Sequence, residues 1–245
     1  MGDTRSVNKG GKAAKRTLTS AVKAAEAVRD ECRALRDEAA RALEAVGFLR
    51  GRMRRDLVRL AWLAGGCTLV NVAGVDWNRD LSPWPAPKAF RPGEDFAGGA
   101  ESYLHPLTEQ LLPAVEAKLP WPVTSRGIVG YSLAGLFAVH TLYLSDCFDF
   151  VGSVSGSLWY DDWLAFALTQ PLCPARIYLS LGDREHKTRN ARMARVKDCT
   201  EAVAAHWQAQ GIPLRLEWNP GGHFDGPQER LRRALDYLVK PALPV

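Results

Sequence analysis

The sequence predicts an α/β fold in which a mostly parallel sheet is flanked by helices, and three observations support this prediction. Strand-like apolar runs alternate with helix-like segments from Thr68 onward, which is typical of a parallel sheet covered on both faces. One short strand passes through a serine-containing turn directly into an apolar helix. Two later strands end in polar loops, one with carboxylates and one with a histidine. Because ligands bind beyond the carboxyl ends of parallel strands, these loops mark the expected site.

The expected strands and helices follow one another in order along the chain. Short, mostly apolar runs predict strands at 68–73, 126–130, 150–155 and 176–181, and alternating apolar and charged residues predict a strand at 213–218. Longer stretches with apolar residues at helical spacing predict helices at 100–118, 133–145, 161–169, 189–210 and 227–239. Because a helix lies between each pair of consecutive strands, the strands are expected to run parallel in one sheet.

Residues 1–66 differ from the rest, and we expect them to form a basic, amphipathic, helical leader ahead of an α/β domain at 67–245. Apolar residues recur every three or four positions from Thr17 to Val46, a pattern typical of an amphipathic helix that needs a partner surface. The helix is therefore expected either to pack on the domain or to pair with a second copy of the chain, forming a homo-oligomer. The alternative is an aberrant start that has replaced the opening strands of the domain.

The positive charge of the chain is concentrated in this leader. Residues 1–60 hold 15 Lys and Arg against 8 Asp and Glu, whereas the remainder holds 17 against 19. A basic amphipathic segment suits nucleic acid or an anionic membrane. Here the opposite charges are interleaved, and no aromatic residue precedes Phe48. We therefore expect no nucleic-acid partner.

A serine occupies the turn between the second expected strand and its helix. Residues 130–135 read Gly-Tyr-Ser-Leu-Ala-Gly, the nucleophile-elbow pattern, in which flanking residues two positions away lack bulk so that the helix can pack on the strand. Ser132 is therefore the candidate nucleophile. The backbone N–H of Leu133, at the helix N-terminus, is the expected oxyanion donor. Taken alone, the pattern also fits an ordinary strand-to-helix turn.

Two later loops carry a carboxylate and a histidine. One strand is followed by Asp183 and Glu185, and the last strand is followed by a glycine-rich loop with His223. The chain order serine, acid, histidine is that of α/β-hydrolases. We expect His223 to act as general base for Ser132 and Glu185 to orient His223, with Asp183 as the alternative acid. The remaining histidines are expected at the surface: His105, His140, His186 and His206.

Further motifs resemble one family over about residues 67 to 240. They lie at residues 98–116, 126–137, 153–159, 179–190 and 218–224. These motifs are similar to the putative-esterase family of α/β-hydrolases, which includes esterase D and the enterochelin (siderophore) esterases. The resemblance implies carboxyl-ester hydrolysis through an acyl-enzyme with no cofactor, carried by Ser132, His223 and Glu185. It also implies opening strands with a glycine-containing loop that supplies a second oxyanion N–H, for which residues 1–66 offer no counterpart.

Aromatic and basic residues near the expected site are candidates for substrate binding. Trp77 and Trp84 lie in a proline-rich loop after the first expected strand, where they would wall an acyl or aryl pocket. Arg79 in the same loop would meet an acidic group of the substrate. Tyr131, beside the nucleophile, and Trp159 are further candidates. The alternative is that the loop residues stiffen the loop and that Tyr131 and Trp159 pack in the core.

Composition limits the location and the chemistry. The five cysteines are odd in number and widely scattered, which is typical of reduced thiols in a cytoplasmic protein. No metal-ligand spacing and no phosphate-binding glycine loop occurs in the sequence. We therefore expect neither a metal nor a nucleotide cofactor. The uncharged run at residues 60–75 is too short and too glycine-rich to span a bilayer.

Two functions remain open at this point. The first is a serine esterase acting on a small-molecule ester, siderophore-like or a simple acyl ester, with transfer of the acyl group to water or to another alcohol. The second is a truncated, catalytically weak hydrolase fold that serves as an interaction or self-association module through its leader. The missing oxyanion loop motivates the second, because loss of one donor costs roughly 10²- to 10³-fold in turnover.

Overall fold

The structure is a computed structural model that describes residues 61–63, 67–89, 93–119 and 122–239. Contacts divide the chain into two units between Gly74 and Val75, and each unit is described by itself. The helix predicted between Thr17 and Val46 lies outside the described residues. Among the described residues, no helix is long and apolar enough to cross a membrane.

The described part of the first unit is a small antiparallel hairpin. Strand β1 (Ala61–Leu63) pairs with β2 (Cys67–Leu69), with Leu63 opposite Cys67. The predicted strand 68–73 is therefore wrong in extent and in partner, since residues 70–74 form no helix or strand. Residues 61–63, predicted within the helical leader, form a strand. A short connection joins antiparallel neighbours, whereas a parallel pair needs a crossover of a dozen or more residues.

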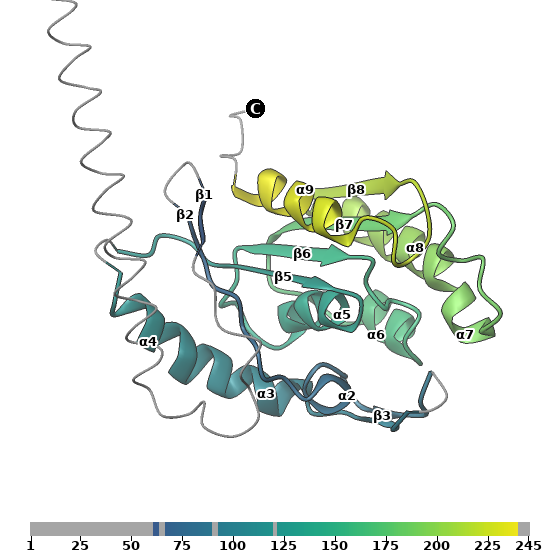
Figure 1. The fold of residues 1–245 in the computed structure, drawn as a ribbon, viewed down its shortest axis with the longest axis horizontal. Coiled ribbons are helices and arrows are strands. Elements are labelled where there is room, and N and C mark those ends of the chain that lie inside the picture. Colours follow the sequence, from purple (N-terminus) through teal and green to yellow (C-terminus); the bar gives the residue numbers. More distant parts are fainter. Residues whose placement is uncertain (1–60, 64–66, 90–92, 120–121, 240–245) are drawn as a thin grey trace, which may run out of the picture. The chain divides into compact units, whose positions relative to one another are not determined.

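Four parallel strands in the second unit form the sheet that carries the candidate site. They are β5 (Gly127–Tyr131), β6 (Phe150–Val154), β7 (Arg176–Gly182) and β8 (Leu214–Asn219), in that spatial order (Figure 1). Each strand begins and ends within one residue of its predicted bounds. The register pairs Tyr131 with Val154, Val154 with Ser180, and Gly182 with Asn219. The carboxyl ends of the strands therefore meet at one edge of the sheet, and the predicted parallel α/β architecture is confirmed.

The predicted helices are present, and several are broken into shorter pieces. The segment after residue 99 forms α3 (Ala100–Pro106), the π-helical stretch η2 (Leu107–Leu111) and α4 (Leu112–Glu116). Pro106 and Pro113 lack the N–H groups that would continue a regular helix. The others are α5 (Leu133–His140) with the 3₁₀ turn η3 (Thr141–Tyr143), α6 (Trp163–Thr169), α7 (Ala191–Ala194), α8 (Val196–Ala209) and α9 (Pro227–Val239).

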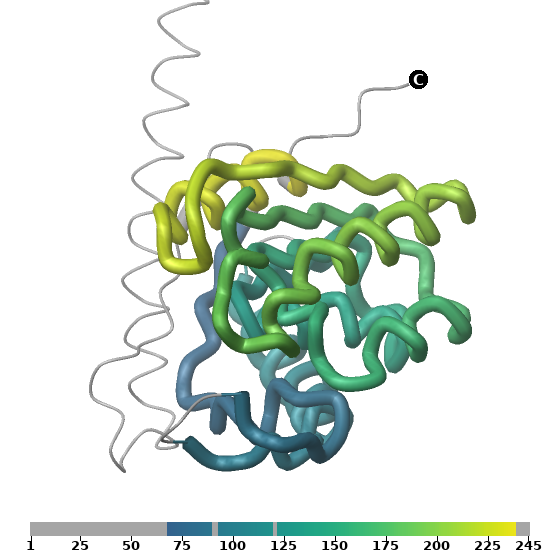
Figure 2. The backbone as a smooth tube through the Cα atoms, turned by 90° about the vertical axis from the view of Figure 1, so that its right-hand side faces the viewer, coloured from purple at the N-terminus to yellow at the C-terminus, as the bar shows by residue number. Residues whose placement is uncertain are grey.

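The sheet has a helix layer on each face. Helix α9 packs on β5, β6 and β7, and Figure 2 shows it along one side of the sheet. On that face Val154 and Tyr178 are buried against Ala234 and Leu238 of α9. Helix α5 covers the opposite face of β5 and β6 (Figure 1). Side chains on a strand alternate between faces, so each strand contributes to both halves of the core.

The segment predicted as a long proline-rich loop contains short regular elements. Helix α2 (Trp77–Asp80) is followed by the two-residue strands β3 (Pro85–Ala86) and β4 (Phe96–Ala97), which pair antiparallel. The Asp76 side chain accepts a hydrogen bond from the Arg79 N–H at 3.2 Å and caps the helix. Gly98 has φ +76°, and a Cβ there would lie 2.5 Å from Pro85, so this crossing requires glycine.

His140 is buried, and its predicted surface position is wrong. Its side chain on α5 is 4% exposed and meets Trp84 edge to face, with 6.0 Å between ring centroids. Burial lowers the pKa of His140 to about 4, so the imidazole is neutral near pH 7. His105 is exposed, whereas His186 and His206 are partly exposed. Nearly every residue of helix α5 is buried. A helix with apolar residues on every side is expected to be buried in this way.

Candidate active site

Ser132 lies in a sharp turn between β5 and α5. Its φ of 60° and ψ of −121° belong to a region that residues with a side chain rarely adopt. The Ser132 N–H donates to the Val154 carbonyl at 3.0 Å. A Cβ at Gly130 would lie 2.0 Å from the carbonyl oxygen of Ala134, so only glycine permits the helix to start this close to the strand. This is the geometry of the nucleophile elbow.

Leu133 is the first residue of α5 and is 3% exposed. The first N–H groups of a helix have no partner within the helix, and the helix dipole makes this end positive. An oxygen that gains negative charge beside Ser132 is therefore favoured by the start of α5. The Leu133 N–H is the group that the sequence predicts as oxyanion donor, and it follows Ser132 directly.

His223 lies in the loop after β8 and bridges the serine and the acid. Its Nε2 is 3.1 Å from Ser132 Oγ, and its Nδ1 is 2.7 Å from Glu185 Oε2. The imidazole packs against two aromatic rings, Tyr131 at 5.3 Å and Phe224 at 4.9 Å between centroids. The Tyr131 hydroxyl also donates to the His223 carbonyl. With Nδ1–H held by the carboxylate, Nε2 can accept the proton of the Ser132 hydroxyl.

The two predicted acids occupy different positions. Glu185 is 8% exposed, and its Oε1 accepts hydrogen bonds from the Gly182 N–H at 2.7 Å and from Ser155 Oγ at 2.8 Å. Asp183 is exposed, and its Oδ1 accepts from the Gly221 N–H at 2.8 Å. Of the two carboxylates, Glu185 contacts the imidazole. Asp183 instead binds the backbone of the loop that carries His223.

Hydrogen bonds keep Glu185 ionised although it is buried. Burial raises the pKa of Glu185, but hydrogen bonds from His223, Gly182 and Ser155 together outweigh burial, so the pKa lies below its usual value. A carboxylate that is charged at neutral pH fixes the imidazole tautomer and stabilises the imidazolium. The site therefore has the groups that nucleophilic acyl transfer requires.

Two polar residues at this site, Arg230 and Ser155, have no part in the sequence prediction. Arg230 on α9 is 2% exposed, and its Nη1 is 2.8 Å from Glu185 Oε1 and 2.9 Å from Ser155 Oγ. Ser155 follows β6 directly and has φ 50°. One signal could have revealed Arg230: it lies four and eight positions before the buried Ala234 and Leu238. This spacing puts a charged residue on the apolar face of the helix.

The predicted substrate-binding residues are spread over different surroundings. Tyr131 lies against His223, as described above. Trp77 is 49% exposed. Trp84 donates from Nε1 to the Asp161 carbonyl at 3.0 Å and packs edge to face on Phe166. The Trp159 side chain is 5% exposed, so it packs in the core.

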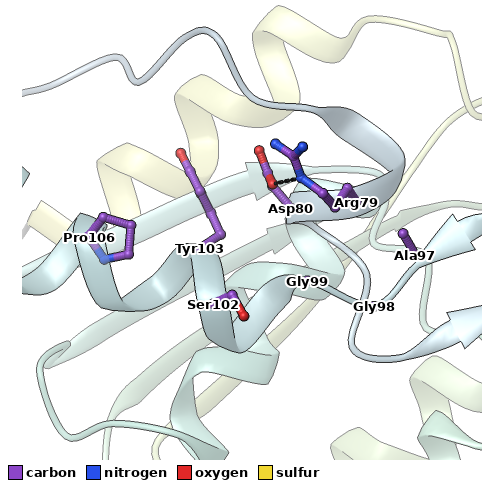
Figure 3. A pocket seen from close by; sticks show the side chains of 8 residues that line it. All are labelled: Arg79, Asp80, Ala97, Gly98, Gly99, Ser102, Tyr103 and Pro106. Carbon is purple, nitrogen blue, oxygen red and sulfur yellow. Dashed lines mark hydrogen bonds and ion pairs between the residues drawn. The ribbon is translucent and has the colours of Figure 1, made fainter.

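Arg79 lines a cavity of about 560 Å³ together with Asp80, Ser102 and Tyr103. Arg79 Nε is 2.8 Å from Asp80 Oδ1, and Figure 3 shows both side chains pointing in the same direction as Tyr103. The remaining lining residues have short side chains or none: Ala97, Gly98, Gly99 and Pro106. In the part of the chain that the structure describes, no group of three His, Cys, Asp or Glu residues could hold a metal ion.

Comparisons with known proteins relate the chain to one family. The model of the family described as "Putative esterase" matches residues 68–227. The uncharacterized protein YbbA of Bacillus subtilis (strain 168) is 31% identical over 140 residues, which cover 54% of this chain and 55% of that protein. The chain thus spans about half the length of this curated relative.

Solved structures share the fold at low identity. Siderophore hydrolase EstA from Aspergillus nidulans matches with a TM-score of 0.57 and 21% identity over 70% of each chain. An IroE-like serine hydrolase from Shewanella oneidensis matches with a TM-score of 0.57 and 18% identity, covering 69% of this chain and 57% of that chain. At these identities the likeness is one of fold.

Proposed function

Because this chain belongs to the Putative esterase family, we propose that it is a serine hydrolase that cleaves a carboxyl ester through an acyl-enzyme on Ser132. One observation carries the proposal: the His223 ring joins Ser132 Oγ at 3.1 Å to Glu185 Oε2 at 2.7 Å. A nucleophile, a base and a group that orients the base, each within hydrogen-bond reach of the next, are the parts that this chemistry needs.

In the proposed mechanism, Ser132 Oγ attacks the ester carbonyl carbon while His223 Nε2 takes the hydroxyl proton. Glu185 stays ionised and stabilises the imidazolium through Nδ1–H. The oxyanion is stabilised by the Leu133 N–H and the N-terminus of α5. His223 then gives its proton to the leaving alkoxide, and the alcohol departs. Water attacks the acyl-enzyme by the same steps in reverse, which releases the acid and restores Ser132.

For the substrate, we propose a siderophore-like ester or a small acyl ester. The family and the names of the two structural relatives, a siderophore hydrolase and a serine hydrolase, support this range. Tyr131 beside the imidazole and Arg79 at the cavity are proposed to contact the substrate. Trp77 is proposed as an exposed aromatic contact, and Trp84 and Trp159 as residues that support the site through packing.

We also propose that residues 67–245 form the hydrolase domain and residues 1–66 a separate leader. The start of the family match at residue 68 supports this boundary, whereas the pairing of β1 with β2 crosses it and contacts divide the chain after Gly74. A cytoplasmic location is proposed from the free thiols of the described Cys147, Cys173 and Cys199. Self-association through the leader remains a prediction. The elution size of the protein before and after deletion of residues 1–60 tests it, because an unchanged monomer would contradict it.

The test of the proposed function compares the protein with its Ser132→Ala variant. The measurements are hydrolysis of short-chain p-nitrophenyl esters and covalent labelling by a fluorophosphonate. Ser145→Ala is the matched control, since Ser145 is partly exposed and its Oγ accepts a hydrogen bond from the Cys147 N–H, with no contact to the imidazole. Turnover and labelling should be retained in the control and lost in Ser132→Ala, with circular dichroism unchanged. Equal turnover in all three proteins would contradict the proposal.

A further inference from the structure

Arg230 is a fully buried cation whose polar contacts all belong to the candidate active site. Its side chain and that of Glu185 are each 2% exposed. A buried ion pair has a desolvation cost that only good geometry and further hydrogen bonds offset. Beyond Glu185 and Ser155, Arg230 donates from Nη2 to the carbonyls of Gly222 at 2.9 Å and Pro220 at 3.2 Å. The guanidinium is thus bound to the acid and to the loop of the histidine.

The two carboxylate oxygens of Glu185 bind different partners. Oε1 accepts from the Gly182 N–H, Ser155 Oγ and Arg230 Nη1, at 2.7, 2.8 and 2.8 Å. Oε2 accepts from His223 Nδ1 at 2.7 Å. Three donors on one oxygen stop the carboxylate from rotating and leave the other oxygen directed at the imidazole. Arg230 is the charged member of these three donors.

The other arm of the guanidinium acts on the histidine loop. Gly222, whose carbonyl binds Nη2, directly precedes His223. Gly182 leaves room for this approach: a Cβ there would lie 2.4 Å from the Gly221 carbonyl oxygen and 2.9 Å from Arg230 Nη2. Because the guanidinium is planar and its donors form a fixed fork, one side chain holds the loop and the carboxylate at a set separation.

We propose that Arg230 is a positioning residue that holds Glu185 and His223 in the alignment needed to activate Ser132. This inference rests on the proposed function. Arg230 touches neither Ser132 nor the imidazole, and it acts through the carboxylate and the loop. A misplacement on the order of 1 Å costs about 10²-fold in rate, so the expected loss on removing Arg230 is about 10²-fold in kcat, with KM little changed.

The first experiment is independent of turnover. The far-downfield proton resonance of His223 Nδ1–H reports its hydrogen bond to the carboxylate, and a His223→Gln variant assigns it. We expect Arg230→Met to lose or shift this resonance. Arg233→Met is the matched control, because Arg233 lies on the same helix and binds the exposed Glu229 at 3.1 Å. An unchanged resonance in a folded Arg230→Met protein would overturn the proposal, whatever the activity of the wild type.

Kinetics separate positioning from a general loss of structure. Arg230→Lys keeps the charge without the fork, so it should recover part of the kcat that Arg230→Met loses. Wild-type kcat in Arg230→Met would contradict the proposal.

Removal of Arg230 alone leaves the Glu185 charge buried without its partner and can prevent folding. The double variant Glu185→Gln with Arg230→Met removes both charges. Because Arg230 acts through Glu185 as well as through the loop, the double variant should lose less activity than the product of the two single losses. Additive losses would overturn the proposal. A wild type without Ser132-dependent turnover would refute the proposed function, while the resonance of His223 would still decide the role of Arg230.

Discussion

The two sides of the candidate site are built by different physical means. On the serine side, the close contacts of Gly130 are with Ala134 and Gly135, within a few residues of Ser132 on β5 and α5. On the acid side, Glu185 is 38 positions from His223 and 45 from Arg230 along the chain. The serine side depends on local sterics, and the acid side depends on buried charges that the fold brings together. A sequence pattern can therefore predict the first side far better than the second.

This difference predicts different effects of substitution. On the serine side, a misfit between backbone atoms has no flexible side chain that can move away, so a substitution acts mainly on folding. On the acid side, most contacts are hydrogen bonds to one carboxylate, so a substitution of similar shape acts mainly on the proposed chemistry. The predictions below test this contrast.

The largest expected effect is on the acid side. Glu185→Gln keeps the shape of the side chain but removes the charge that fixes the tautomer of His223, so kcat should fall by about 10³- to 10⁴-fold. Asp183→Asn is the matched control, because Asp183 is exposed and its carboxylate contacts the Gly221 N–H and Arg184 rather than the imidazole. The control should change kcat by less than about tenfold. The kcat for ester hydrolysis is measured for both variants. A larger loss of kcat in Asp183→Asn than in Glu185→Gln would assign the role of the acid to Asp183.

On the serine side, Gly130→Ala should act on stability. The new Cβ would lie 2.0 Å from the Ala134 carbonyl oxygen, so β5 and α5 must separate, at a cost of about 3 kcal/mol or more. Gly222→Ala is the control, since its Cβ would meet no atom closer than 3.8 Å, and its cost should be about 1 kcal/mol or less. Urea unfolding followed by circular dichroism gives both values. Equal free energies of unfolding for the two variants would show that the turn accommodates a Cβ at residue 130 at little cost.

The sequence predicts those strands and helices whose hydrophobic pattern extends over enough residues to be recognised. Three of the four parallel strands are short, mostly apolar runs and the fourth, β8, alternates apolar and polar residues, and their bounds lie within one residue of the predicted ones. The grouping of Ser132, Glu185 and His223 was also predicted, because the carboxyl ends of parallel strands share one edge. Their catalytic roles stay predictions that the variants above test.

Other features gave too little signal in the sequence. The strands β1, β2, β3 and β4 have two or three residues each, too few for a period to be recognised. His140 and Arg230 are polar residues at buried positions of helices, so residue type alone predicts them at the surface. Their burial depends on partners far away in the chain: Trp84 packs on His140, and Glu185 pairs with Arg230.

His140 gives a smaller effect, visible in the pH dependence of stability. Its folded pKa of about 4 is below the usual 6.5, so between these values the unfolded chain binds a proton that the folded chain does not. The contribution of His140 to the free energy of unfolding is complete above pH 6.5. It declines as the pH falls toward 4, and at pH 5 about 2 kcal/mol has been lost. His140→Phe should abolish this part of the decline. Urea unfolding of both proteins at pH 7.5 and 5 measures it, and parallel declines would contradict the prediction.

The smallest expected effect concerns Phe224, whose ring stands edge to face on His223 while the residue is 82% exposed. An aromatic side chain this exposed contributes little to folding, so Phe224→Ala should change the free energy of unfolding by less than about 0.5 kcal/mol. Beside the imidazole, the ring offers an apolar surface to a bound ester. Its removal should raise KM for aryl and long-chain esters by about three- to tenfold, since burial against one ring is worth about 1 kcal/mol.

Trp218→Ala is the matched control for Phe224, because Trp218 is also exposed, at 39%, and the Lys197 ammonium lies 5.9 Å from its ring centroid. It should leave KM unchanged for every ester. Equal KM values in Phe224→Ala and the wild type would mean that the substrate does not pass over the Phe224 ring. A rise in KM confined to the larger esters would instead assign Phe224 to substrate selection, on the acid side of the site and outside the network that holds Glu185.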